Sequence, residues 1–151
     1  MPELAEEVPK PDISSPEALK CTLLAAKSIA YSNPAGGATS GIHFATVLNR
    51  LSIANEMKSK TVFPKSGPVG VLVANGEAEL GVQQIQELMS VARIEIIGPL
   101  PGDDLQDTIV FLAAIMASAR DIEASRALVN FLRTPEAVAV IKAKGMEPAI
   151  P

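Results

Sequence analysis

Aromatic residues are nearly missing from this sequence, which has no Trp, one Tyr and four Phe among its 151 residues. The core must therefore be built from Ala, Val, Ile and Leu, which suits close packing of helices on a sheet. Hydrophobic residues still make up 48% of the chain and charged residues only 20%, a composition typical of a folded domain. A chain of this length can enclose one sizeable core.

The sequence also has only one cysteine and one histidine. Cys21 cannot form an internal disulfide, and its place in a helical pattern predicts a small buried hydrophobe. No metal-ligand spacing recurs, so we expect no metal site and no cofactor. Asp103, Asp104 and Asp107 form an acidic cluster, which we interpret as a solvated loop and not as a metal site.

Clustered positive charge and long apolar runs are missing as well. The net charge is −4 and the pI is about 5.0, with no basic face, so nucleic-acid binding is not expected. The longest apolar run, residues 109–117, has nine residues and is too short for membrane insertion. Residues 1–10 lack a basic start and an apolar core, so the chain as given has no signal peptide and would be cytoplasmic.

Turn residues divide the chain into alternating strands and helices. Residues 1–13 are interpreted as an extended lead-in and residues 14–151 as a single α/β domain. Ser15, Pro16 and Glu17 predict a helix start, with Leu19, Leu23 and Ala26 buried and an end near Lys27. Strands are predicted at 28–31, 60–63, 79–83 and 94–97, helices at 41–55 and 69–75, and a short helix or turn at 84–89.

The C-terminal third is less regular. Residues 108–117 start with β-branched side chains and continue with alanines, so both strand and helix fit, and we interpret them as a strand. Helices are predicted at 121–132, capped by Asp121, and from Thr134 to a stop at Gly145. Their inward residues are expected to be Ile122, Leu128, Phe131, Leu132, Val138 and Ile141. Strands alternating with helices predict a parallel sheet flanked by helices.

The glycine-rich loop at residues 32–41 is the main candidate for a binding site. It lies between a predicted strand and a predicted helix, and it ends on Thr39 and Ser40, which suit N-capping. Such a turn gathers unpaired backbone N–H groups and a positive helix end around one point, which suits an anion. A second glycine turn at 66–70 follows the next strand, and parallel strands end at one edge of a sheet. An ordinary turn, whose glycines only satisfy backbone geometry, remains the alternative.

Several motifs resemble, in order, the second lobe of molybdate-type solute-binding proteins of ABC transporters, which have the type 2 periplasmic binding fold. The motifs are residues 23–34, 36–44, 73–84 (VANGEAELGVQQ), 98–101, 126–137 and 144–148. The resemblance spans residues 9–149 and is closest to the branch with Gln-Gln where molybdate binders use a tyrosine.

The resemblance implies a three-layer lobe with a mostly parallel central sheet between helices. Its second-lobe core would be residues 28–100, and its return strand and closing helices residues 108–151. It also implies that the first lobe is missing, that the protein is periplasmic, and that a transporter permease is a partner if the chain is secreted. The ligand-binding residues that it suggests are Asn33, Gly36, Gly37, Ala38, Thr39, Ser40, Gly41, Pro68, Val69, Gly70, Gln83 and Gln84.

From these observations we predict a non-enzymatic solute-binding-like domain that binds a small oxyanion or carboxylate. A missing lobe would leave apolar surface, so we expect a homodimer or larger homo-oligomer, with residues 108–120 and the last two helices at the interface. The alternative is a small isomerase or lyase acting on a carboxylate, with His43 beside the loop as acid/base. A surface or capping histidine is the plainer interpretation of His43, and a purely interacting protein is a third class.

Overall fold

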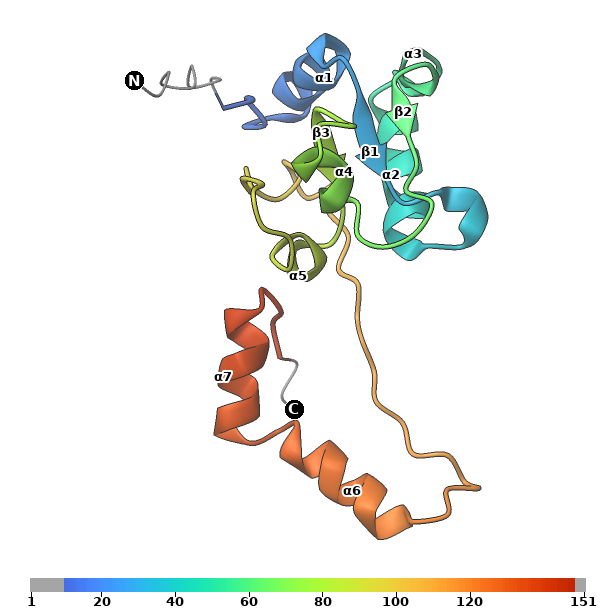
Figure 1. Cartoon of the computed structure of the whole chain (residues 1–151), viewed down its shortest axis with the longest axis vertical. Helices are drawn as coiled ribbons and strands as arrows, with labels where there is room; N and C mark the ends of the chain where they lie inside the picture. The colour runs from blue at the N-terminus through green and yellow to red at the C-terminus, as the bar shows by residue number, and fades with distance from the viewer. Residues whose placement is uncertain (1–9, 149–151) are drawn as a thin grey trace.

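The computed structural model describes residues 10–148 (Figure 1). A body built around a small sheet is followed by an extended segment that leads away from it to the last two helices, and the chain after the second of these returns beside Ile85 and Met89 of the body at Gly145. Most of the predicted lead-in, residues 1–9, lies outside the described residues, as do residues 149–151. Residues 10–13 have no regular secondary structure.

The elements alternate between helix and strand through the body. In chain order they are α1 (Pro16–Ala25), β1 (Ile29–Tyr31), the 3-10 turn η1 (Pro34–Gly36), α2 (Thr39–Arg50), α3 (Ala54–Lys58), β2 (Thr61–Val62), α4 (Gly70–Ala74), β3 (Leu80–Val82), α5 (Ile85–Leu88), α6 (Ile122–Phe131) and α7 (Pro135–Ala143). Within residues 10–148, no helix combines the length and the apolar content that crossing a bilayer requires.

The sheet has three parallel strands in the order β2-β1-β3. Ile29 of β1 is paired with Thr61 on one side and with Leu80 on the other. The first three predicted strands and the α/β class with a parallel sheet are therefore confirmed. Because all three strands are parallel, their carboxyl ends lie at one edge of the sheet, next to the turns that lead into η1, α4 and α5.

Helices pack on the sheet from two sides. Ile29 and Tyr31 of β1 belong to the main core cluster, together with side chains of α1, α2 and α3. The residue between them, Ala30, packs instead with Val69 and Ala78 in a second cluster, beside α4. Tyr31 meets the ring of Phe44 edge-on at 5.0 Å between centroids, so the lone tyrosine is a core residue.

Helix α1 begins as predicted, since the Ser15 side chain accepts a hydrogen bond from the Ala18 N–H. Leu19, Leu23 and Ala26 are buried, as expected. Cys21 is exposed, so the prediction of a buried hydrophobe was wrong. It lies two residues after Leu19, which places it roughly 200° around the helix from the buried stripe.

The predicted helix at 41–55 is in fact two helices, α2 and α3. The chain breaks between them because Ser52 takes a left-handed conformation, with φ of 56°. Capping by Thr39 and Ser40 was also wrong: the N-cap residue is Ala38, and no side chain caps the helix. Thr39 is instead the first helical residue.

Two predicted strands do not form. Residues 94–97 and 108–117 both lack regular secondary structure. A strand needs a neighbour for its backbone N–H and C=O groups, and a cavity separates β3 from residues 94–97. Residues 108–117 extend away from the body, where no described strand lies beside them. The hydrophobic pattern of these residues could not show that a neighbouring strand is lacking.

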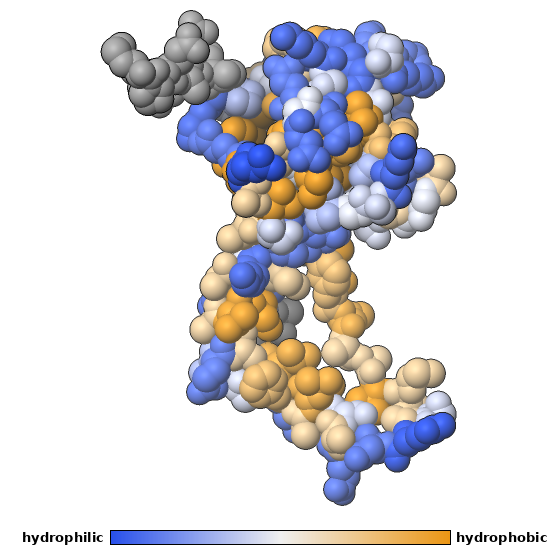
Figure 2. Space-filling view, viewed as in Figure 1, coloured by the Kyte–Doolittle hydropathy of each residue, from blue (hydrophilic) through white to orange (hydrophobic). Residues whose placement is uncertain are grey.

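The last two helices start and stop where predicted, with Asp121 and Thr134 as side-chain caps and Gly145 in a left-handed conformation. The expected inward face of α6 was wrong. Its residues Ile122, Leu128 and Phe131 are exposed, as is Leu132 after it. The extended segment before α6 carries it away from the core, and Figure 2 shows apolar side chains along this part of the molecule.

Candidate functional site

A cavity of about 700 Å³ lies beside the carboxyl end of β3. It is bounded by α1, the first turns of α2, the strand β3, and the segments 94–100 and 106–109. Several of the residues proposed from the sequence line it: Ser40, Gly70, Gln83, Gln84 and the alternative catalytic residue His43. The two glycine turns thus reach this cavity through their last residues.

Most residues of the first glycine loop have a structural role and stabilise its backbone conformation. The side chain of Asn33 accepts a hydrogen bond from the Ala35 N–H at 3.0 Å and so caps the turn η1, and Gly37 follows with φ of 77°. A Cβ at Gly41 would lie 2.0 Å from the carbonyl oxygen of Ser32, so only glycine permits this approach of α2 to the loop. Asn33, Gly36, Gly37, Ala38, Thr39 and Gly41 are not among the residues that line the cavity.

The second turn is joined to the end of β3 by a side chain. Gln83 Oε1 accepts a hydrogen bond from the Val69 N–H at 2.8 Å, next to Pro68 and Gly70. Gln84 Oε1 accepts from Gln86 Nε2 at 2.5 Å. The structure therefore brings Val69 and Gln83 together, and Gln83 serves as an acceptor for the turn. Anion binding at these residues stays a prediction.

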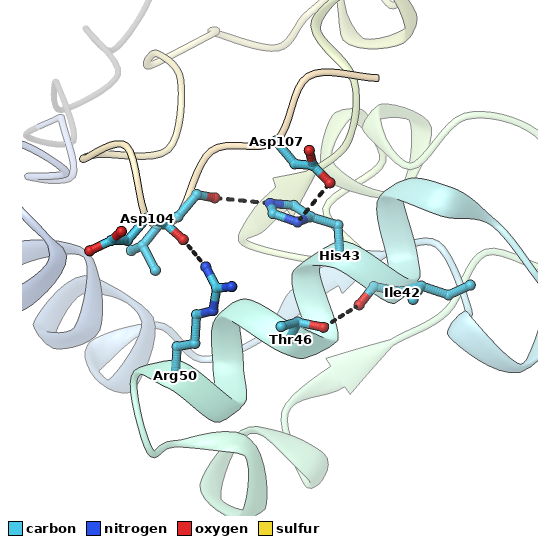
Figure 3. Close-up of polar contacts among 7 residues, drawn as sticks. Ile42, His43, Thr46, Arg50, Asp104 and Asp107 are labelled. Atoms are coloured by element: carbon cyan, nitrogen blue, oxygen red, sulfur yellow. Dashed lines mark hydrogen bonds and ion pairs between the residues drawn. The ribbon is translucent and has the colours of Figure 1, made fainter. Parts of the chain in front are cut away.

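His43 is fixed in the cavity wall by a loop that is distant in the sequence (Figure 3). Its Nε2 lies 2.9 Å from the carbonyl oxygen of Leu105, and its Nδ1 lies 3.8 Å from Asp107 Oδ2. A carbonyl oxygen can only accept, so Nε2 carries the hydrogen and donates it. In the neutral ring, Nδ1 then has a free lone pair. The ring is 19% exposed, which leaves it open to the cavity that it lines.

The loop that holds the ring is itself anchored on α2. Leu105 is buried in the main core, and the guanidinium of Arg50 donates to the carbonyl oxygen of Asp104. Interpreting Asp103, Asp104 and Asp107 as a solvated loop missed that the Asp107 carboxylate lies beside His43. No sequence signal could have shown that this loop contacts His43, because the contact between His43 and Leu105 spans 62 positions. In the described part of the chain, no group of three or more His, Cys, Asp or Glu could hold a metal ion.

The described residues of the cavity wall carry more negative than positive charge, with three carboxylates and one lysine, so this charge does not favour an anion. Lys10 forms an ion pair with Glu95 at 2.5 Å, and Glu79 accepts the backbone N–H of Lys27 at 2.7 Å. The third carboxylate in the wall, Asp107, is the one beside His43. Among the described lining residues, an anionic ligand would thus depend on backbone N–H groups and hydroxyls for much of its binding.

With this geometry in view, comparison with known proteins identifies the family. Residues 2–147 match the family described as "Bacterial extracellular solute-binding protein". The chain belongs to this family. The match confirms the solute-binding resemblance, while molybdate-type specificity is not part of the family description.

Within the curated proteins, an aconitate isomerase from a Pseudomonas species is 38% identical over 141 residues. The aligned region covers 93% of this chain and 52% of the isomerase, so the chain spans about half the length of this relative. By its name the relative is an enzyme, which overturns our expectation of a non-enzymatic binding domain and favours the alternative built on His43. No solved structure matches the chain significantly.

Proposed function

We propose that this solute-binding-family chain is an isomerase domain that acts on a small unsaturated polycarboxylate such as aconitate, with His43 as the acid/base. The observation that carries the proposal is the ring of His43, held in the cavity wall with Nε2 bonded to Leu105 and with no hydrogen-bond partner for Nδ1 among the described residues. The name of the 38% identical relative supports the same reaction class.

The chemistry requires one group that removes and returns a proton. Aconitate is a propene with a carboxylate on each of its three carbons, the third of which is a methylene group. Removal of a methylene proton leaves an allylic carbanion that the adjacent carboxylates stabilise by delocalisation. Return of the proton to the former vinyl carbon moves the double bond across the central carbon, and the new double bond can take either geometry. No atoms or electrons are gained or lost, and a single base with a free lone pair is enough.

The first turn of α2 supplies the groups next to this base. Ser40 lines the cavity one turn before His43, and no side chain caps the N-terminus of α2. In the proposal, the backbone N–H and the hydroxyl of Ser40, which lines the cavity, bind a substrate carboxylate. That carboxylate would place the substrate methylene group near Nδ1 of His43.

We also infer that the sheet is a lobe of the type 2 periplasmic binding fold. Three parallel strands in the order β2-β1-β3, with α1 and α2 on one face and α4 on the other, support this finer assignment. The chain would then use a binding-protein scaffold for catalysis, which agrees with the general finding that one fold hosts unrelated functions.

Proton transfer can be tested directly in heavy water. We expect the purified chain to exchange aconitate C–H protons for deuterium and to interconvert the cis and trans isomers, both followed by proton NMR. His43→Asn should reduce both rates about 10²- to 10⁴-fold, the usual contribution of a general acid/base.

Thr46→Ala is the matched control, because Thr46 lies on α2 one turn after His43 and bonds only the Ile42 carbonyl of its own helix among described residues (Figure 3). It should retain the wild-type rates. A folded wild-type chain without exchange, or a His43→Asn variant as fast as the wild type, would contradict the proposal.

A further inference from the structure

The loop at residues 102–107 is fastened to α2 and to the core at three points. Leu105 is 4% exposed and packs in the main core cluster, and Arg50 donates to the carbonyl of Asp104. The third point is the hydrogen bond from His43 Nε2 to the Leu105 carbonyl. Figure 3 shows that these contacts come from one face of α2, where His43 and Arg50 lie two turns apart. The loop therefore has a defined position relative to the imidazole ring.

We propose that this loop prepares His43 for proton transfer: the Leu105 carbonyl selects the base atom, and Asp107 stabilises the ring once it carries the substrate proton. The inference rests on the proposed function. With Nε2 committed as a donor to Leu105, the atom that takes the proton is Nδ1. Asp107 Oδ2 lies 3.8 Å from that atom.

The separation between Nδ1 and Asp107 suits this role. An ionised carboxylate only accepts hydrogen bonds, so at 3.8 Å it leaves the lone pair on Nδ1 of the neutral ring available for a substrate proton. The carboxylate attracts the ring more strongly after the ring has become cationic, so it lowers the free energy of the state that follows proton removal. Asp107 is thus a positioning residue that acts through His43.

The other charged groups around the ring are occupied elsewhere. Arg50 is bound to the Asp104 carbonyl, and across the cavity Lys10 is paired with Glu95. Glu79, also in the cavity wall, accepts a backbone N–H. Asp104 contributes its carbonyl to Arg50, and its side chain is exposed with the rest of the residue. Among the described residues, Asp107 is the carboxylate that lies beside the His43 ring.

Kinetics of Asp107 variants test its contribution. Asp107 is 63% exposed, so its effect is screened, and Asp107→Asn should lower kcat for aconitate only about three- to fivefold, with KM unchanged. Asp107→Glu should restore most of the loss. Added salt should lower the wild-type kcat toward that of Asp107→Asn, whose own kcat should respond little to salt. Asp103→Asn, an exposed carboxylate in the same loop, is the control and should behave as the wild type.

The tautomer can be measured without turnover, because the chain has one histidine and imidazole nitrogen signals can come from no other residue; couplings to the ring protons then distinguish Nδ1 from Nε2. Nitrogen-15 NMR at alkaline pH should show the neutral ring with its hydrogen on Nε2, in the wild type and in Asp107→Asn. A ring with the hydrogen on Nδ1 would overturn the role of Leu105, and an active wild type with an unchanged Asp107→Asn kcat would overturn that of Asp107. A folded wild-type chain without turnover would instead reject the proposed function, while the tautomer measurement would still decide the role of Leu105.

Discussion

At the scale of single residues, glycine has two different uses in the loop before α2. Gly36 lies in open space, since a Cβ added there would meet no heavy atom within 4 Å beyond its chain neighbours, whereas Gly41 is pressed against the backbone of Ser32. Both residues fit the same sequence pattern for an anion loop. Only the contact with Ser32 shows that Gly41 is needed so that the helix can approach the preceding strand end.

This difference can be tested by substitution. Gly41→Ala should destabilise the fold by about 1–3 kcal/mol, because the new Cβ would overlap the Ser32 carbonyl and force the backbone to move. Gly36→Ala should change the free energy of unfolding far less. Urea unfolding followed by circular dichroism measures both, and equal midpoints for the two variants would contradict the packing role of Gly41.

At the scale of elements, helix starts show how far local sequence decides structure. Ser15 caps α1, Asp121 caps α6 and Thr134 caps α7, each through a hydrogen bond to a backbone N–H three residues later. Helix α2 has no such cap, although Thr39 and Ser40 lie at its start. The preceding loop brings Ala38 to the capping position and places Thr39 within the helix.

Capping variants should follow this distinction. Ser15→Ala removes the acceptor of the Ala18 N–H and should lower the free energy of unfolding by about 1 kcal/mol. Thr39→Ala should leave stability nearly unchanged, because the exposed Thr39 side chain caps nothing. Thermal or urea unfolding compares the two variants, and a larger loss in Thr39→Ala than in Ser15→Ala would refute the assigned N-cap.

At the scale of the whole molecule, the main feature is apolar surface on the extended segment and on α6. Leu112 is 88% exposed and Met116 is 74% exposed, and Phe131 of α6 is exposed as well. Figure 2 shows orange surface along this part of the molecule. Contiguous apolar surface of this kind is typical of sites that contact another protein surface.

We therefore predict that the chain self-associates through residues 108–120 and the last two helices. Light scattering at tens of micromolar should give the mass of a homodimer or a larger oligomer. The double substitution Leu112→Lys and Phe131→Lys should shift it to monomer, because burying two unpaired charges opposes association. Val71→Lys, at an exposed apolar residue on α4 and outside the predicted interface, is the control. A wild-type chain that is monomeric at this concentration would refute the prediction.

Local sequence determined the elements whose signals are contained within a few residues. The starts of α1, α6 and α7, the three strands of the sheet and the glycine stop at Gly145 all follow from caps, turns and short apolar runs. Parallel pairing followed from the alternation of strands and helices. The glycine turns lie at the edge of the sheet, where Ser40 and Gly70 line the cavity, and their binding role stays a prediction.

Only the tertiary structure decided the features that depend on residues distant in the sequence, namely strand pairing and the surroundings of His43. Residues 94–97 and 108–117 have the apolar pattern of strands but no described strand beside them, so their backbone groups form no ladder. The sequence shows only that His43 follows the glycine loop. The tertiary structure adds the loop at 102–107, which places the Leu105 carbonyl and the Asp107 carboxylate beside the ring. A local pattern reports on contacts within a few turns of the chain, whereas a site assembled across 62 positions exists only after the intervening sheet has formed.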